Sequence, residues 1–234
     1  MLAIYKREMR AYFTSPIGYV FVAIFLAISG AVFCGTTLFS GTSDMNVYFT
    51  IMVFVYIILL PLLTMKQFSE ERKLRTEQLL MTAPVSIVGM VMGKYLATLT
   101  MFVGSLALTS LNILVLYDYS APKTAVILGS LLAITLLGMS FLAIGLFVSS
   151  LTENQLASVV GTIGILLGLA TCSLLGSLIN FYPIRFVLSA LSVFSRFQNF
   201  TQGVLDIASL IYYVSITAAF LFLTVRVYDK RRFG

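Results

Sequence analysis

The stretch from Lys66 to Lys94 reads KQFSEERKLRTEQLLMTAPVSIVGMVMGK and holds eight of the 24 charged residues of the chain (15 Lys and Arg, 9 Asp and Glu). Elsewhere the chain is strongly apolar. Of its 234 residues, 59% are hydrophobic and 10% are charged, and the mean hydropathy is +1.01. Soluble domains are about half apolar and about a quarter charged. The composition therefore indicates an integral membrane protein in which one charged loop, here called the elbow (residues 66–94), faces water.

The length of the chain sets the number of membrane spans. A helix needs about 20 apolar residues to cross a bilayer, so the chain holds about six spans with short connections and no separate soluble catalytic domain. The sequence predicts an all-α integral membrane protein with one transmembrane domain over residues 1–234. The six expected spans are residues 17–38, 47–65, 87–117, 123–150, 156–179 and 207–227.

Residues 1–15 are expected to form a helix that lies along the membrane surface. Lys6, Arg7 and Arg10 share one side of this helix, and Pro16 ends it. The opposite side carries Leu2, Tyr5, Met9, Tyr12 and Phe13. One charged face and one apolar face are typical of an interfacial helix.

The distribution of basic residues predicts the orientation of the spans. With both termini in the cytoplasm, twelve of the 15 Lys and Arg residues lie inside, and only Lys123, Arg185 and Arg196 lie outside. Cytoplasmic loops carry this excess of positive charge. The same rule accounts for the pI near 9.4, so no nucleic-acid partner is expected.

The order of charges in the elbow is compatible with a helix. Glu71 and Arg75 are four residues apart, and Glu70 and Lys73 are three apart, which are favourable pairings on a helix. Pro84 disfavours a helix at the residue before it. The elbow is therefore predicted to hold a short cytoplasmic helix. The alternative is a plain positive loop that fixes topology, although such a loop does not need glutamates in helical order.

The segment from Gly89 to Lys94, GMVMGK, superficially matches a phosphate-binding loop. Its glycines are separated by three residues rather than four, and Tyr95 follows where Ser or Thr is required. No nucleotide site is predicted, and Lys94 is expected to extend toward the lipid headgroups. Because the chain has no histidine, and Cys34 and Cys172 lie within apolar runs, no bound cofactor or metal is expected.

Two spans carry stripes of small residues. The stripe in span five comprises Ala157, Gly161, Gly164, Gly168, Cys172 and Gly176. A weaker stripe in span one comprises Ala23, Ala27, Ala31 and Cys34. Small residues let helices approach closely in lipid. The stripes predict an interface with a second subunit, with packing inside one chain as the alternative.

Carboxylates near the middle of a span, which ion-coupled carriers use, are not evident. Asp44, Asp118 and Asp206 fall on the outer side, and Glu153 falls in the inner turn 151–155. This arrangement argues against a proton-driven carrier. An ion-coupled carrier or channel, which would work without an ATP-hydrolysing partner, is a further alternative.

Three groups of residues within the elbow form a signature. They are Thr76-Glu77-Gln78-Leu79-Leu80, Pro84-Val85-Ser86 and Gly93-Lys94. This combination resembles the permease subunits of ATP-binding-cassette (ABC) exporters of the type-2 export class. The run from Phe197 to Asp206, FQNFTQGVLD, followed by Tyr212 and Tyr213, is similar to the branch that includes the gliding-motility-associated permease.

The resemblance implies a six-span half-transporter of the type V exporter fold in the bacterial plasma membrane. A second copy or a paralogous permease would complete it, and two copies of a separate ABC ATPase would bind ATP and Mg²⁺. The permease itself is then not an enzyme, and an auxiliary membrane or extracytoplasmic subunit is a further expected partner. The expected cargo is an unidentified lipid-like or amphipathic substrate. The alternative function is a non-transporting membrane scaffold of an ATPase-driven surface or motility machine.

The resemblance also implies roles for particular residues. Residues 68–83 would form the helix that couples to the ATPase, and the turn 151–155 would form a smaller contact. The residues assigned to ATPase coupling are Glu70, Glu71, Arg72, Arg75, Glu77, Gln78, Leu79, Pro84 and Glu153. Residues 180–205 would form outer re-entrant helices, with Pro183, Phe197 and Gly203 at the outer gate. The small-residue stripes place the permease dimer interface at Ala27, Ala31, Gly161, Gly164, Gly168 and Cys172.

Overall fold

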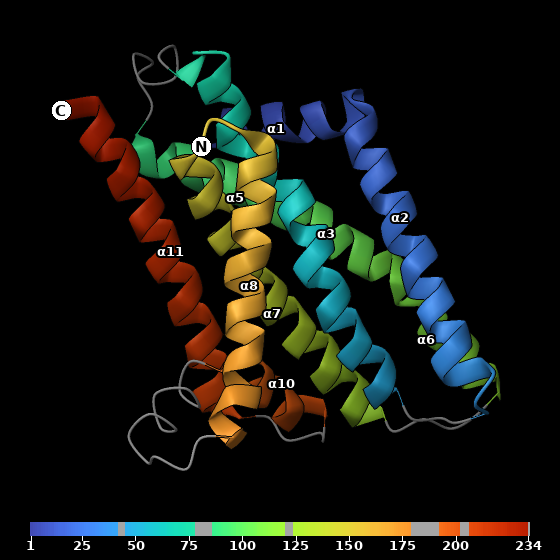
Figure 1. The fold of residues 1–234 in the computed structure, drawn as a ribbon. Coiled ribbons are helices and arrows are strands. Elements are labelled where there is room, and N and C mark those ends of the chain that lie inside the picture. Colours follow the sequence, from blue (N-terminus) through green and yellow to red (C-terminus); the bar gives the residue numbers. More distant parts are fainter. Residues whose placement is uncertain (42–44, 78–85, 120–123, 179–191, 202–205, 234) are drawn as a thin grey trace.

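The computed structural model of the chain describes residues 1–41, 45–77, 86–119, 124–178, 192–201 and 206–233. All regular elements within these ranges are helical. Six helical segments among them are long and apolar enough to cross a membrane, as the sequence predicts. Figure 1 shows them in one bundle, with both chain termini at the same end. This end, which also carries the start of the elbow, is called the charged end.

The helical segments agree in number and order with the expected spans. In chain order they are α1 (Leu2–Thr14), α2 (Pro16–Phe33), the π-helical turn η1 (Cys34–Leu38), α3 (Asn46–Lys73), α5 (Ile87–Thr109), α6 (Leu111–Tyr119), α7 (Thr124–Leu151), α8 (Gln155–Leu178), α10 (Val193–Thr201) and α11 (Ile207–Phe233). Two spans are longer than expected, since α3 continues past residue 65 and α11 past residue 227. The third span is divided at Ser110.

Helix α1 crosses the charged end of the bundle at a steep angle to the spans (Figure 1). Ser15 has an extended backbone, with φ −93° and ψ 151°, as is usual before a proline, and Pro16 then begins α2. Ser15 Oγ accepts a hydrogen bond from the amide of Ile17 at 3.4 Å. This corner turns the chain from α1 into the first span and lets α1 pack against α2 and α5.

Only part of the apolar face of α1 packs against the bundle. Tyr12 is buried, and Tyr5 and Met9 are half-buried against the core. Leu2 and Phe13 are exposed, 73% and 52% respectively. Exposed apolar side chains on such a helix are suited to contact with the acyl region of a membrane.

Helices α3 and α7 form the centre of the bundle. They are the most deeply buried spans and lie against each other. Aromatic rings join α3 to its neighbours: Phe25 of α2 stacks on Tyr56 of α3 with ring centroids 5.5 Å apart, and Tyr56 meets Phe102 of α5 edge-on at 5.4 Å. Such pairs add to the packing energy of the buried rings, so three spans are held together by one aromatic cluster.

Gly138 of α7 provides the space that Phe102 occupies. A Cβ atom at this position would lie 2.2 Å from Cε1 of the Phe102 ring, which is far inside van der Waals contact. Phe102 is fully buried, so its ring packs against neighbours on all sides. The close approach of α5 to α7 therefore depends on the missing side chain of Gly138.

At the end opposite the charged end, the loop before α11 contains the short helix α10, which packs against α7 and α8. Its Phe197 and Phe200 are buried. The hydroxyl of Tyr213 in α11 donates to the carbonyl of Val193 at 2.9 Å. Residues 179–191 and 202–205 lie outside the described residues, so the re-entrant helices expected over 180–205 stay a prediction.

The packing at Gly138 gives a first testable prediction. Replacing Gly138 by alanine should lower the free energy of unfolding in detergent by about 1–3 kcal/mol, because the added methyl group overpacks the site of Phe102. Gly104 is the matched control, since it is an exposed glycine of α5 with nothing within 4 Å of an added Cβ. Chemical unfolding of both variants measures the difference. Equal stability of Gly138→Ala and Gly104→Ala would show that the ring of Phe102 can move aside.

Candidate functional site

Helix α3 ends inside the elbow with a defined C-cap. Arg75 has a positive φ of 57°. The amide of Thr76 donates to the carbonyl of Glu71 at 2.9 Å, and the amide of Arg75 donates to the carbonyl of Arg72 at 3.0 Å. These two bonds define a Schellman motif, in which Arg75 occupies the left-handed position that glycine usually takes. The cap projects Leu74, which is 64% exposed, beyond the end of the helix.

The coupling helix expected over residues 68–83 does not begin where the sequence placed it. Residues 68–73 belong to α3. The helical pairing expected between Glu71 and Arg75 is wrong, because the helix has ended before Arg75 and Glu71 binds other cations. Residues 78–85, which include the expected coupling residues Gln78, Leu79 and Pro84, lie outside the described part of the chain.

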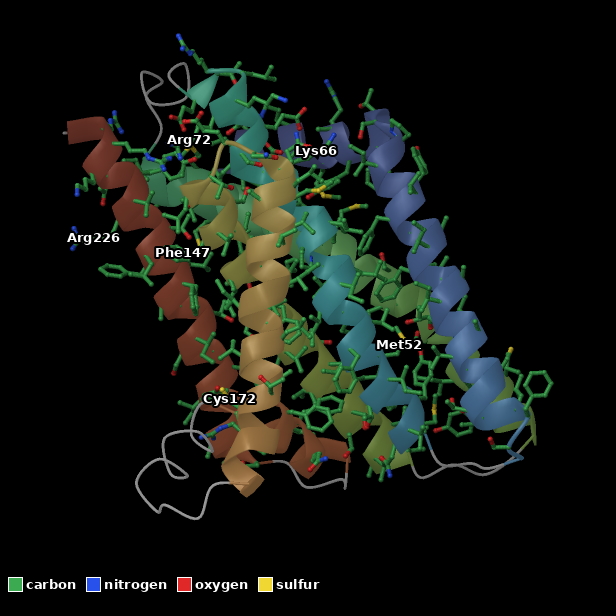
Figure 2. All side chains as sticks on the ribbon, viewed as in Figure 1. Met52, Lys66, Arg72, Phe147, Cys172 and Arg226 are labelled. Atoms are coloured by element: carbon green, nitrogen blue, oxygen red, sulfur yellow. The ribbon has the colours of Figure 1, made fainter. Side chains whose placement is uncertain are left out.

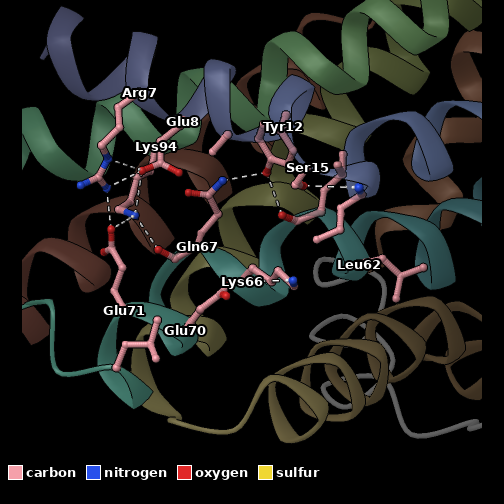
Figure 3. A pocket seen from close by; sticks show the side chains of 14 residues that line it. Arg7, Glu8, Tyr12, Ser15, Leu62, Lys66, Gln67, Glu70, Glu71 and Lys94 are labelled. Carbon is pink, nitrogen blue, oxygen red and sulfur yellow. Dashed lines mark hydrogen bonds and ion pairs between the residues drawn. The ribbon is translucent and has the colours of Figure 1, made fainter.

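Four side chains from three helices form a closed ion cluster (Figure 3). This Lys94 cluster comprises Arg7 and Glu8 of α1, Glu71 of α3 and Lys94 of α5. Lys94 Nζ lies 2.9 Å from Glu71 Oε1 and 3.3 Å from Glu8 Oε1. Arg7 Nη2 lies 2.5 Å from each of the same two oxygens. Two cations and two carboxylates balance, so the cluster fastens α1 and α5 to the last turns of α3 without net charge.

Lys94 is the buried centre of this cluster, with 1% of its side chain exposed. It also donates to the carbonyl of Gln67 at 2.6 Å and lies 5.1 Å from the ring centroid of Phe68. The expectation that Lys94 extends to the lipid headgroups is therefore wrong. Burying an ammonium group without partners is very costly. Here two carboxylates, a carbonyl and an aromatic face replace the water that Lys94 has lost.

Tyr12 and Gln67 continue the polar contacts between α1 and α3. Gln67 Nε2 donates to the hydroxyl of Tyr12 at 2.7 Å, and this hydroxyl donates to the carbonyl of Leu63 at 2.9 Å. Burial raises the pKa of Tyr12, so its hydroxyl keeps the proton that it donates. For Arg7, burial alone would lower the pKa, but the hydrogen bond and charge of Glu8, together with those of Glu71, leave it raised. The donors on α1 are therefore protonated at any ordinary pH.

Gly93 allows α1 to lie close to α5. A Cβ atom on Gly93 would lie 3.1 Å from the carbonyl oxygen of Met1 and 3.2 Å from Cβ of Ile4. These distances are tighter than ordinary van der Waals contacts. The Gly93-Lys94 pair that superficially matches a phosphate-binding loop thus has two structural roles, because the glycine admits α1 and the lysine holds it.

A second ion cluster lies at the end of α7. This Arg231 cluster comprises Arg72 of α3, Glu77, Glu153 and Arg231 of α11. Arg72 Nε lies 2.9 Å from Glu153 Oε1, and Arg231 Nη1 lies 3.8 Å from Glu77 Oε2. Arg231 and Arg72 also donate to the carbonyls of the last two residues of α7, at 2.7 Å and 2.9 Å respectively. Carbonyls at a helix C-terminus lack partners within the helix and favour nearby cations.

A groove of about 410 Å³ opens beside the Lys94 cluster, between α1, the start of α2 and the end of α3 (Figure 3). Its charged lining residues are Arg7, Glu8, Lys66, Glu70, Glu71 and Lys94. Its apolar lining residues are Ala11, Ile17, Leu62, Leu63 and Leu74. Sites for small ligands measure about 300–1,000 Å³, so the groove is large enough to hold one.

Among the expected coupling residues, the structure brings Glu70, Glu71 and Arg72 together in the last turn of α3. Glu153 is exposed in the turn after α7, where it pairs with Arg72. Figure 2 shows Arg72 and Lys66 at the charged end. For the outer gate, Phe197 is buried beside Phe194, with ring centroids 6.5 Å apart. Pro183 and Gly203 lie outside the described residues.

The small-residue stripes of α2 and α8 face mainly outward. The exposed members are Ala23, Ala27, Ala31, Ala157, Gly164 and Gly168. Nothing lies within 4 Å of a Cβ added at Gly164 or Gly168. Gly161 instead faces the chain itself, since its added Cβ would lie 3.3 Å from Val148 Cγ1. Cys172 is half-buried toward the end opposite the charged end, where Figure 2 shows it.

Sequence reasoning missed Glu8, Gln67 and Arg231, and it gave Lys94 the wrong role. Two signals were present. Glu8 is the one acidic residue among residues 1–15, and Lys94 lies within an apolar span, where an ionisable side chain requires a partner. The sequence does not show that these two residues meet, because 86 positions separate them.

Comparison of the chain with models of known protein families and with characterised proteins found no match. The geometry of the elbow and the residues that resemble a permease signature are therefore the basis for a functional proposal.

Loss of the buried ammonium group tests the Lys94 cluster. Lys94→Met keeps an unbranched side chain only one atom shorter but leaves Glu8 and Glu71 without this cation. Breaking a buried ion pair in this way should cost about 3–5 kcal/mol of unfolding free energy. Lys6→Met, at an exposed position of α1, should cost less than about 1 kcal/mol. Unfolding in detergent compares the two variants, and similar losses would mean that water already solvates Lys94.

Proposed function

We propose that the chain is the transmembrane permease subunit of an ATP-driven ABC exporter and that its elbow couples to a separate ATPase. One observation carries the proposal. Glu71 and Arg72 are neighbours in the last turn of α3, and they belong to different ion clusters. Through these clusters the last turn of α3 is bonded to α1, α5, the end of α7 and the turn after it, and Arg231 of α11 donates to the same end of α7. A displacement applied at the cap would therefore reach most of the bundle.

The signature residues of the elbow support an ATPase as the source of this displacement. The charged end would face the cytoplasm of a bacterial cell, since basic residues gather there. Leu74, Arg75 and Thr76 are exposed at the cap, and Glu153 lies on the same side. These residues would form the described part of the docking surface. ATP and Mg²⁺ would bind to two copies of the ATPase, and hydrolysis would belong to that partner.

A second permease, identical or paralogous, would complete the transport path. The outward stripes on α2 and α8 offer backbone surfaces where another helix can approach closely. Opening and closing would follow from a change of packing along such surfaces. The buried Phe197 of α10 would belong to the outer gate, and a lipid-like or amphipathic cargo would suit the apolar spans. An auxiliary subunit would be a further partner.

The cap of α3 allows a direct test of ATPase docking. In the double variant Leu74→Asp with Arg75→Glu, ATP hydrolysis that co-purifies with the chain should fall by at least about tenfold, as for the loss of a central interface residue. Lys230→Glu, at another exposed basic residue of the charged end, is the matched control and should retain the activity. The proposal fails when the wild-type chain carries no Mg²⁺-dependent ATPase, or when the cap variant keeps all of it.

Sealed vesicles separate transport from a scaffold function. The chain and its co-purified ATPase would be reconstituted, and ATP-dependent movement of fluorescent amphipathic lipids between leaflets would be measured. Movement supports an exporter. Continued ATP hydrolysis without movement of any cargo would assign the chain to a non-transporting scaffold.

The stripe on α8 allows a test of the permease dimer. Gly164→Leu with Gly168→Leu should reduce the dimer fraction by about tenfold or more, because bulky side chains hold the two backbones apart. Gly104→Leu is the matched control, as it adds the same side chain at an exposed glycine of α5. Cross-linking in membranes reports the dimer. An unchanged pattern would remove α8 from the interface.

A further inference from the structure

The groove beside the Lys94 cluster differs in character along its length. Its end nearest the cap of α3 is lined by charged side chains, and its other end is lined by Ile17 of α2 and Leu62 of α3. Ile58, one turn before Leu62 on α3, is 59% exposed. The apolar wall therefore continues into the surface of a membrane span. A ligand that fits this groove has a charged head and an apolar tail.

Two side chains at the charged end of the groove have binding capacity left. Lys66 and Glu70 are 34% and 41% exposed, and Lys66 Nζ lies 3.9 Å from Glu70 Oε2, beyond hydrogen-bond distance. An exposed pair of this kind contributes little to stability. By contrast, Lys94 is only 1% exposed, and Glu71 is 16% exposed and binds two cations. Arg7 is 48% exposed, but it is held by both Glu8 and Glu71 at 2.5 Å. Lys66 and Glu70 are therefore the pair in the groove that can exchange its mutual contact for a ligand.

The charges of the groove match a zwitterionic head rather than an anionic one. Its three cationic and three anionic side chains balance. In addition, the amide oxygen of Gln67 in the wall is buried and accepts no hydrogen bond from the described residues. The primary ammonium group of ethanolamine has three N–H groups that can donate hydrogen bonds to such a wall. The quaternary ammonium group of choline has no N–H to donate.

We propose that the groove binds one phospholipid with a phosphoethanolamine head, with its phosphate on Lys66, its primary ammonium on Glu70 and its acyl chains along Leu62 and Ile58. The inference does not depend on the proposed exporter function, since it concerns only this chain and the lipid around it. The site lies between α1 and α3, so a bound lipid would fill the space next to the contacts that hold the elbow.

Native mass spectrometry of the full chain in detergent tests this site. Phosphatidylethanolamine, phosphatidylcholine and phosphatidylglycerol with the same acyl chains would be added in equal amounts. The wild type should retain one phosphatidylethanolamine about tenfold more than either other lipid, as expected for a charge-assisted hydrogen bond. Equal retention of all three, or a preference for phosphatidylglycerol, would overturn the proposal.

Two substitutions separate the roles of the paired side chains. Glu70→Gln should remove the preference for phosphatidylethanolamine over phosphatidylcholine, while Lys66→Ala should weaken the retention of all three phospholipids. Lys6→Ala, at an exposed position of α1 outside the groove, should change neither. Unchanged melting temperatures would show that all three variants are folded. If Glu70→Gln keeps the preference, the ammonium is not bound where we place it.

A competition experiment with free phosphoethanolamine distinguishes a lipid from a soluble ligand. Free phosphoethanolamine carries the same head without acyl chains, and it should not displace the bound lipid at equal concentration. Displacement by the free compound would assign the groove to a soluble phosphoamine instead.

Discussion

The burial of Lys94 is the constraint on which the charged end of this protein depends. An ammonium group with 1% exposure is tolerated only when fixed partners replace its water. Those partners come from α1 and α3, through Glu8 and Glu71. Helix α1, which the sequence predicts to lie along the membrane surface, therefore also has a role within the fold, because its Glu8 carboxylate completes the site of a buried cation. Gly93 makes this possible by admitting α1 to within contact of α5.

The last turns of α3 join this site to the rest of the bundle. Glu71 belongs to the Lys94 cluster, whereas the adjacent Arg72 pairs with Glu153 and caps the end of α7. Arg231 caps the same helix end from α11. Each of these contacts joins segments far apart in sequence, so they restrict the relative movement of the helices. Such an arrangement is suited to transmitting a displacement from the exposed cap of α3, which is the basis of the proposed coupling to an ATPase.

Much of the fold could be predicted from sequence because its signals are local. Apolar length defined six spans, and Pro16 correctly ended the first helix. The structure of the elbow was harder to predict. Helix α3 continues to Lys73 through charged residues, which hydropathy assigns to a loop. Among these residues, Glu71 is paired by α1 and α5, and Arg72 is paired by the turn after α7. The helix cap at Arg75 could not be recognised from sequence, because the left-handed position is usually taken by glycine and here is taken by arginine.

The sequence by itself determined that the chain is an all-helical membrane protein, where its spans lie and that its charges gather in one elbow. It also contained Glu8 and Lys94 as charged residues in unusual positions. Only the tertiary structure decided that these two meet, that Lys94 is buried rather than extended to the headgroups, and that Glu71 and Arg72 serve separate clusters. Hydropathy and helical period depend on neighbours in the chain. Whether two charged side chains form an ion pair depends on how the helices cross. The crossing is set by contacts between residues dozens of positions apart.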